Sequence, residues 1–156
     1  MTTRILWRGL ATPPGPGPVR MRQARCLMRC GCITIVRGAF TVGGEDLADR
    51  ANRLWSLAKS AVTRRMTTVA VVVGRNAVGA IRTVVATSES GLRSEQKAAL
   101  TLFEDVATGP EGTHAEQKAI AYLESQGYSD IIAVGASRKF CEECAGQIVA
   151  RGLSIP

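Results

Sequence analysis

The sequence predicts a single α/β domain, a small β-sheet flanked by helices, and three observations indicate this class. The chain has 156 residues, which is enough for one compact domain and too few for two. Its composition, 46% hydrophobic and 21% charged, is typical of a globular protein and argues against disorder or a coiled coil. Amphipathic helical segments alternate with short β-branched runs in the order α-β-β-α-α-β-α, with room for a last strand. No apolar run approaches the 18 residues of a membrane span.

The charge pattern divides the chain near residue 40. Residues 1–40 hold seven arginines and no Asp or Glu, whereas residues 41–156 hold 13 basic and 13 acidic residues. The net charge of +7 therefore belongs to a basic leader, which we expect to be irregular because residues 13–18 read Pro-Pro-Gly-Pro-Gly-Pro. Residues 41–156 are expected to form the domain. Because that domain is neutral, its charge does not identify a partner.

The first half of the domain predicts a helix followed by a hairpin. Apolar residues recur at helical spacing over residues 45–65, from Leu47 to Val62. Two β-branched runs follow, residues 67–73 and 78–87, and the turn residues 74–76 between them predict an antiparallel hairpin.

The second half predicts three helices and a strand. Ser94 can cap a helix that continues to about Ala107, with Leu102 and Phe103 on its apolar stripe. A second helix is expected from about His114 to Ser125, with Gly127 ending it. A short buried strand over residues 131–135, a helix over about 141–151 and a last strand from residue 153 complete the predicted order.

Two short motifs carry the chemistry. They are His114-Ala115-Glu116 and Cys141-Glu142-Glu143-Cys144, and each lies at the predicted start of a helix. One imidazole and two thiolates form a tetrahedral zinc set with one position open, as in catalytic sites. Cys141 and Cys144 are three residues apart, so both sulfurs lie on one face of the helix start, where the helix dipole favours thiolates.

Glu116 can lie beside the open position without binding the metal if the site lies beyond the mouth of its helix. A carboxylate there can take a proton from metal-activated water and deliver it to a ring nitrogen and a leaving group. This division of labour suits the hydrolytic removal of an exocyclic amine.

Other interpretations remain open for each motif taken alone. Thr113 and Glu116 fit a capping box, and a lone histidine is more often structural. Cys141 and Cys144 fit a redox pair or two buried thiols as well as a metal site. The two motifs together, with a strand between two helix starts, favour metal. The other cysteines lie in the leader, with a spacing that fits neither a zinc pattern nor a disulfide framework: Cys26, Cys30 and Cys32.

His114-x-Glu116 followed by Cys141-x-x-Cys144 resembles the zinc-dependent nucleoside and nucleic-acid deaminase superfamily, whose signature is H-x-E…P-C-x-x-C. The resemblance covers about residues 41–156 and implies a three-layer cytidine deaminase-like fold, a small mixed sheet of three to five strands between helices. It implies that His114, Cys141 and Cys144 bind Zn²⁺ and that Glu116 moves protons. Residues 137–141, Ser-Arg-Lys-Phe-Cys, are similar to the bacterial toxin deaminases. Phe140 replaces the usual Pro, and few residues follow the last helix.

The resemblance implies a DNA cytosine deaminase of the polymorphic-toxin type, with single-stranded DNA as the preferred substrate. It also implies an immunity protein as a partner and delivery within a larger toxin to a target-cell cytoplasm. We expect no membrane contact, because the sequence has no apolar run of sufficient length. A deaminase of free nucleosides or of adenine in RNA, and a non-catalytic zinc-stabilised binding module, remain alternatives.

Four residues are candidates for substrate contacts, each with a plainer alternative. Asn76 is expected near the sugar or simply in the hairpin turn. Arg138 could contact phosphate or be a solvated charge. Phe140 could stack on a base or fill the core. Thr113 could shape the pocket or only cap the helix.

Overall fold

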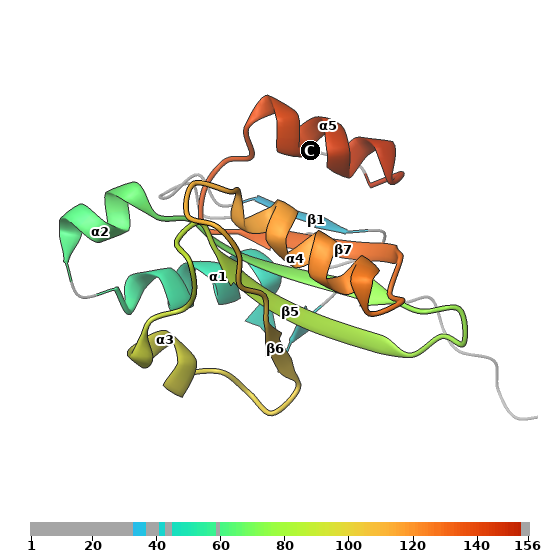
Figure 1. Cartoon of the computed structure of the whole chain (residues 1–156), viewed down its shortest axis with the longest axis horizontal. Helices are drawn as coiled ribbons and strands as arrows, with labels where there is room; N and C mark the ends of the chain where they lie inside the picture. The colour runs from blue at the N-terminus through green and yellow to red at the C-terminus, as the bar shows by residue number, and fades with distance from the viewer. Residues whose placement is uncertain (1–32, 37–40, 43–44, 59, 154–156) are drawn as a thin grey trace, which may run out of the picture.

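The computed structural model describes residues 33–36, 41–42, 45–58 and 60–153, and its centre is a mixed five-stranded sheet (Figure 1). The strand order is β1-β7-β4-β5-β6, and only the β5–β6 pair is parallel. The strands are β1 (Ile33–Val36), β4 (Val69–Arg75), β5 (Ile81–Thr87), β6 (Glu104–Val106) and β7 (Asp130–Ala136). Two short strands, β2 (Thr41–Val42) and β3 (Glu45–Asp46), pair separately.

Helices cover both faces of this sheet, which confirms the predicted α/β class with a mixed sheet. The described helices are α1 (Leu47–Ser56), α2 (Ala61–Met66), α3 (Ser94–Ala98), α4 (Ala115–Ser125) and α5 (Glu142–Ala150). None of them combines the length and the apolar character that crossing a bilayer requires.

The alternation of side chains along β4 explains the two helical layers. Val69, Val71 and Val73 join Leu47 and Leu54 of α1 in one buried cluster. Ala70 and Val72 point to the other face, where they pack in a second cluster with residues of α4 and α5: Ala115, Ala119, Leu123 and Ile148. Because a strand directs successive side chains to opposite faces, a run that is apolar throughout is buried on both sides.

The antiparallel hairpin is confirmed. Strands β4 and β5 pair from Val69↔Thr87 to Arg75↔Ile81, so the turn comes later than predicted, after Arg75. The helix ended by Gly127 and the strand before Cys141 are also confirmed, as α4 and β7. Gly127 has a φ of 81°, the left-handed conformation that ends helices.

The long helix predicted over residues 45–65 is instead two helices. The chain leaves α1 after Ser56, and Ser60 starts α2 by accepting a hydrogen bond from the backbone N–H of Thr63 (3.0 Å). The Trp55 indole donates to the Arg64 carbonyl (2.8 Å), which ties α2 back to α1. Val62, placed on the predicted stripe, is 71% exposed. Apolar residues recur at helical spacing on both sides of the break between α1 and α2, so the spacing alone predicted one continuous helix.

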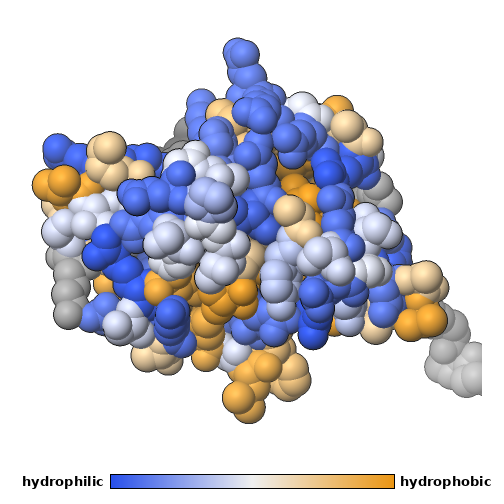
Figure 2. Space-filling model, viewed as in Figure 1, coloured by the Kyte–Doolittle hydropathy of each residue, from blue (hydrophilic) through white to orange (hydrophobic). Residues whose placement is uncertain are grey.

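The helix predicted over residues 94–107 is wrong beyond Ala98. Helix α3 ends there, and residues 104–106 form β6 beside β5. Leu102 is fully exposed and Phe103 is 85% exposed, and apolar surface protrudes where the chain passes from α3 to β6 (Figure 2). Ala99 and Val106, the other two residues of the predicted stripe, pack against the core cluster on the α1 side. Long-range pairing with β5 overrides the local helical pattern.

Strand β1 lies within the segment expected to be an irregular leader. It pairs antiparallel with β7 from Ile33↔Ala136 to Val36↔Ala133 and adds an edge to the sheet. The described residues do not include the leader cysteines, Cys26, Cys30 and Cys32, or residues 154–156 of the predicted last strand. Leu153, the first residue of that predicted strand, is buried and is not part of a strand.

Candidate metal centre

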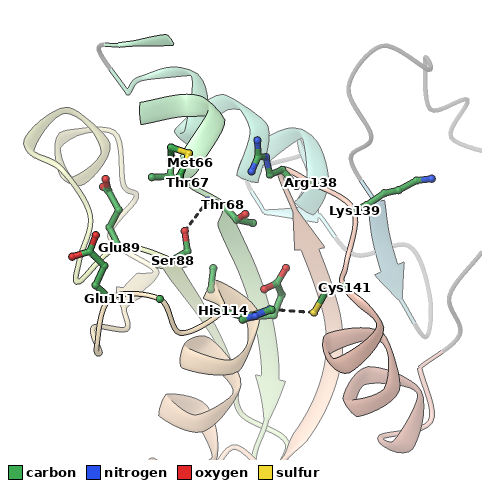
Figure 3. Close-up of a pocket in the computed structure, with 13 residues that line it drawn as sticks. Met66, Thr67, Thr68, Ser88, Glu89, Glu111, His114, Arg138, Lys139 and Cys141 are labelled. Atoms are coloured by element: carbon green, nitrogen blue, oxygen red, sulfur yellow. Dashed lines mark hydrogen bonds between the residues drawn. The ribbon is translucent and has the colours of Figure 1, made fainter. Parts of the chain in front are cut away.

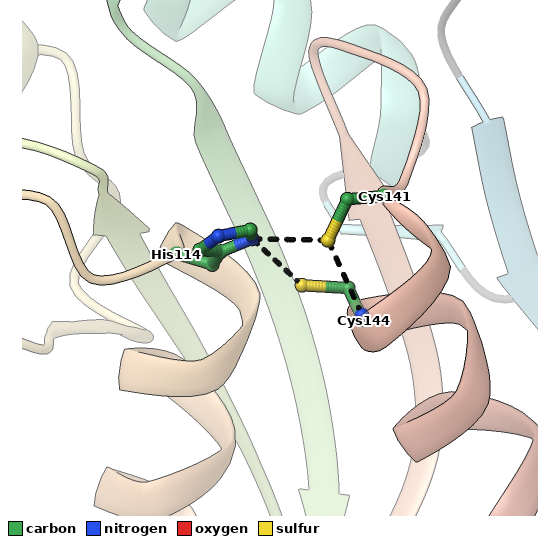
Figure 4. A group of neighbouring side chains, drawn as sticks. All are labelled: His114, Cys141 and Cys144. Carbon is green, nitrogen blue, oxygen red and sulfur yellow. Dashed lines mark hydrogen bonds between the residues drawn. The ribbon is translucent and has the colours of Figure 1, made fainter.

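Two helix starts meet at one end of the sheet and bring the two motifs together (Figure 4). His114 is the N-cap residue of α4, and Cys141 is the N-cap residue of α5. Strand β7 connects the two helices and lies beside β4, so it carries the chain from one motif to the other. The predicted convergence of His114, Cys141 and Cys144 is therefore present in the fold.

The three side chains are close enough to share one metal ion. The Nδ1 atom of His114 lies 3.2 Å from the sulfur of Cys141 and 3.2 Å from that of Cys144, and all three atoms lie within 4.8 Å of one another. Tetrahedral zinc with ordinary bond lengths separates nitrogen and sulfur ligands by about 3.5 Å. The donor types thus suit zinc, and the two nitrogen–sulfur distances reach the zinc values after shifts of a few tenths of an ångström.

The two cysteines of the cluster have different surroundings. Its sulfur accepts a hydrogen bond from the backbone N–H of Cys144 (3.3 Å) at the positive end of α5. Cys144 differs, because it is almost fully buried. Burial, together with the neighbouring Glu116 carboxylate and Cys141, raises the pKa of the Cys144 thiol. A cation between these groups would offset that cost and stabilise both thiolates.

Glu116 lies beside the cluster, in the first turn of α4. It is 4% exposed, and one carboxylate oxygen is 3.7 Å from the Cys144 sulfur. Burial raises the pKa of Glu116 above its ordinary value. The N-cap residue of α4 is His114 rather than Thr113, so the predicted capping box does not form. The Glu116 carboxyl is held where it can exchange protons with a group at the cluster.

A pocket of about 450 Å³ opens over the cluster (Figure 3). Its lining includes His114, Glu116 and Cys141. Arg138 and Lys139 lie on the side of Cys141, and the Lys139 side chain points away from the other labelled residues (Figure 3). Across from them stands a wall that we call the far wall, formed by the ends of two loops: Ser88, Glu89, Glu111 and Gly112. Met66, Thr67 and Thr68 line the pocket beside the end of α2, and Ala115 lines it between His114 and Glu116.

Of the four predicted substrate contacts, only Arg138 lines this pocket. Asn76 lines a separate hollow with Gly127, at the far end of α4 from His114. An 11-residue helix spans about 16 Å, so Asn76 is remote from the cluster. Its side-chain oxygen instead accepts the N–H groups of Val78 and Ala80 in the turn.

The other two candidates have structural environments. Phe140 is partly buried and packs against the core cluster under α4. Thr113 precedes the helix, and its backbone N–H donates to the Pro110 carbonyl (3.4 Å). Neither side chain is part of the pocket lining.

Sequence reasoning missed the residues of the far wall and the strand ends beside it. Thr68 and Ser88 lie opposite each other across the hairpin, where the Ser88 hydroxyl accepts the Thr68 N–H (3.0 Å). They follow no motif. The only available signal was their place at the open end of the predicted hairpin, and the misplaced turn obscured it.

Comparison with known proteins adds no relative: no family model, no curated protein and no solved structure matches the chain. What the fold and the site define is an α/β protein with a His-Cys-Cys group that could hold a metal ion under an open pocket.

Proposed function

We propose that the protein is a zinc-dependent hydrolytic deaminase that converts cytosine to uracil in DNA, with single-stranded DNA preferred. The observation that carries the proposal is the convergence of His114, Cys141 and Cys144 beside the buried carboxyl of Glu116. With this site, we assign the three-layer arrangement to the cytidine deaminase-like fold. The toxin-type sequence before Cys141 supports a cytosine base, a larger toxin as the source and an immunity protein as a partner.

In this proposal, His114, Cys141 and Cys144 would hold the zinc ion. A bound zinc ion supplies a Lewis acid that lowers the pKa of water from about 16 to about 7. The net reaction places a water oxygen on C4 of cytosine, breaks the C4–N4 bond and releases ammonia.

Glu116 performs the proton transfers that this reaction requires. Its carboxylate accepts a proton from water and delivers it to the ring nitrogen, and a further transfer through the same group protonates the departing amine. A raised pKa suits this role, because it makes the Glu116 carboxylate a stronger base for the proton that water gives up. The buried position keeps bulk water from competing for the proton.

The polymer substrate is supported by the surroundings of the pocket rather than by net charge. Arg138 lines the pocket on the side of Cys141, where it can contact phosphates of an entering strand, and Lys139 adds a second positive charge beside it. A single strand presents its bases without the few kcal/mol needed to extrude a base from a duplex.

A substrate panel tests the proposal. The zinc-loaded full chain is incubated with single-stranded DNA, duplex DNA, RNA and free nucleosides, and the products are read by mass. We expect cytosine-to-uracil conversion in single-stranded DNA above all. Turnover of free nucleosides alone, or of adenine in RNA alone, would contradict the proposed DNA substrate. Zinc binding without any turnover would contradict the proposed enzyme and support a zinc-stabilised binding module.

A further inference from the structure

Lys118 is a buried cation that the proposed chemistry does not use. It lies on α4, two residues after Glu116, and is 5% exposed. Its ammonium donates to three consecutive backbone carbonyls, those of Thr87 (3.1 Å), Ser88 (3.3 Å) and Glu89 (2.5 Å). Burying an ammonium is costly unless such oxygens surround it, and burial lowers the pKa of Lys118.

The three carbonyls belong to the segment that ends β5 and begins the far wall. Ser88 and Glu89 line the pocket directly. Because all three oxygens point to one nitrogen, the path of this segment is fixed relative to α4, the helix that also carries His114 and Glu116.

The second loop of the far wall packs on the same lysine. A Cβ atom added at Gly109 would lie 3.4 Å from Cγ, Cδ and Cε of Lys118, so the loop passes close to its aliphatic stem. The N–H of Gly112 donates to the Ser88 carbonyl (3.2 Å), which joins the two loops. One side chain thus contacts both segments that form the wall.

We propose that Lys118 is the positioning residue of the pocket, holding the far wall at a set distance from the His114–Cys141–Cys144 cluster. The part of this proposal that concerns substrate binding rests on the proposed function, because the far wall affects catalysis only if the pocket binds the base. Its structural half, that Lys118 orders residues 88–91 and 109–113, stands independently of any activity.

The test compares Lys118→Met with Lys97→Met in the zinc-loaded full chain. Lys97 is an exposed lysine on α3, so its replacement makes the same change in charge away from the pocket. In Lys118→Met we expect amide hydrogen exchange in residues 88–91 and 109–113 to rise about tenfold or more, with β4 and β7 unchanged. We expect zinc content to stay at one ion per chain and Lys97→Met to match the wild type throughout.

Kinetics separates positioning from a general loss of stability. We expect Lys118→Met to raise KM about tenfold with kcat nearly unchanged, since Glu116 and the zinc ligands stay in place. Uniformly faster exchange, or unchanged exchange in the far wall, would overturn the proposal. If wild-type protein deaminates nothing, the proposed function fails, and the exchange pattern still decides the role of Lys118.

A second variant covers the case in which Lys118→Met does not fold. Lys118→Gln keeps a donor on a shorter side chain that reaches fewer of the carbonyls. We expect it to fold with an intermediate rise in exchange confined to the far wall. Failure of both variants to fold would show that Lys118 supports the whole domain and would contradict a local role.

Discussion

At the scale of single residues, the proposed mechanism assigns metal binding and proton transfer to different side chains. Glu116 neighbours the cluster, yet the three atoms that can share an ion come from His114, Cys141 and Cys144. Replacing Glu116 with Gln keeps the shape and removes the acid–base group. We expect this variant to bind one zinc ion per chain as the wild type does and to lose activity by about a hundred- to ten-thousand-fold. Metal analysis and the deamination assay measure the two properties on one sample.

A matched control substitution tests whether any loss of activity is specific to Glu116. Glu143→Gln changes an exposed carboxylate at the start of α5, whose oxygen accepts a hydrogen bond from Gln117 (2.8 Å). We expect it to be nearly as active as the wild type. Equal losses in the two variants would remove Glu116 from the mechanism.

The sequence identified the residues of the cluster because their spacing is local. H-x-E and C-x-x-C each lie within one helical turn, and only their meeting depends on the fold. Asn76 shows the opposite case: nothing in its sequence neighbourhood reveals that the turn lies at the far end of α4 from His114. The far wall depends on contacts of Lys118 with residues about 30 positions away, and no local pattern encodes them.

At the scale of elements, one buried ion pair attaches β6 to α1. Arg50 donates to both carboxylate oxygens of Glu104 (2.8 and 2.5 Å), and the two side chains are 2% and 0% exposed. Arg50 also donates to the Ala99 carbonyl (2.8 Å), and the Thr101 N–H donates to Glu104 (2.8 Å). These bonds explain why the chain leaves α3 early: residues 99–104 wrap around a charge pair that no helical pattern predicts.

The ion pair makes stability depend on pH. Burial opposes ionisation of Glu104, but the hydrogen bonds from Arg50 and Thr101 and the charge of Arg50 lower its pKa overall. A carboxyl with a lowered folded-state pKa stabilises the fold above its unfolded-state value, near 4.5, and that contribution is lost as the pH falls through the folded-state value. We expect Glu104→Gln to cost about 3–5 kcal/mol at pH 7 and progressively less below pH 4.5.

Urea unfolding of both proteins across this pH range measures the difference. The double variant Arg50→Met/Glu104→Leu serves as control, because an apolar replacement of both partners avoids an unpaired buried charge. We expect it to recover stability relative to Glu104→Gln. A gap between wild type and Glu104→Gln that stays constant with pH would contradict this account of the pair.

The contact between α1 and β7 depends on a glycine. A Cβ atom at Gly135 would lie 2.4 Å from the carbonyl carbon of Leu47 and 2.6 Å from the Ala48 nitrogen. These are backbone atoms that cannot turn aside, so we expect Gly135→Ala to destabilise the fold by about 2 kcal/mol or more. At Gly146, in α5, a Cβ atom would meet no side chain and no other described segment within 4 Å. We expect Gly146→Ala to stabilise by about 0.5–1 kcal/mol, and thermal unfolding of both variants checks the contrast. Equal effects of the two substitutions would contradict the close approach of α1.

At the scale of the whole molecule, the metal is expected to serve chemistry more than folding. The sheet has a buried apolar cluster on each face, and neither cluster includes His114, Cys141 or Cys144. The core can therefore form without the metal. We therefore expect the protein to stay folded after chelation, as judged by its circular dichroism spectrum, and to unfold at a lower Tm. At zinc concentrations about a thousand times Kd, binding adds about 4 kcal/mol to the free energy of unfolding. Unfolding on chelation at room temperature would instead mean a structural metal site.

The α/β class, the hairpin, α4 and β7 followed from periodicity because each buries a regular apolar pattern against the sheet. The two edge strands of the sheet, β1 and β6, could not be predicted in this way. Strand β1 pairs with a strand about 100 residues later, and β6 pairs with β5 across the α3 segment. Both are three or four residues long, too short for a pattern of their own. Their existence depends on the partner strands.

Zinc X-ray absorption of the purified full chain tests the central claim most directly, because it counts the ligands. We expect two sulfurs at about 2.3 Å, one nitrogen at about 2.0–2.1 Å and one further light atom, with a sulfur lost in Cys144→Ser. Three or four sulfurs, which would draw on Cys26, Cys30 or Cys32, or an absence of bound zinc, would contradict a centre built from His114, Cys141 and Cys144.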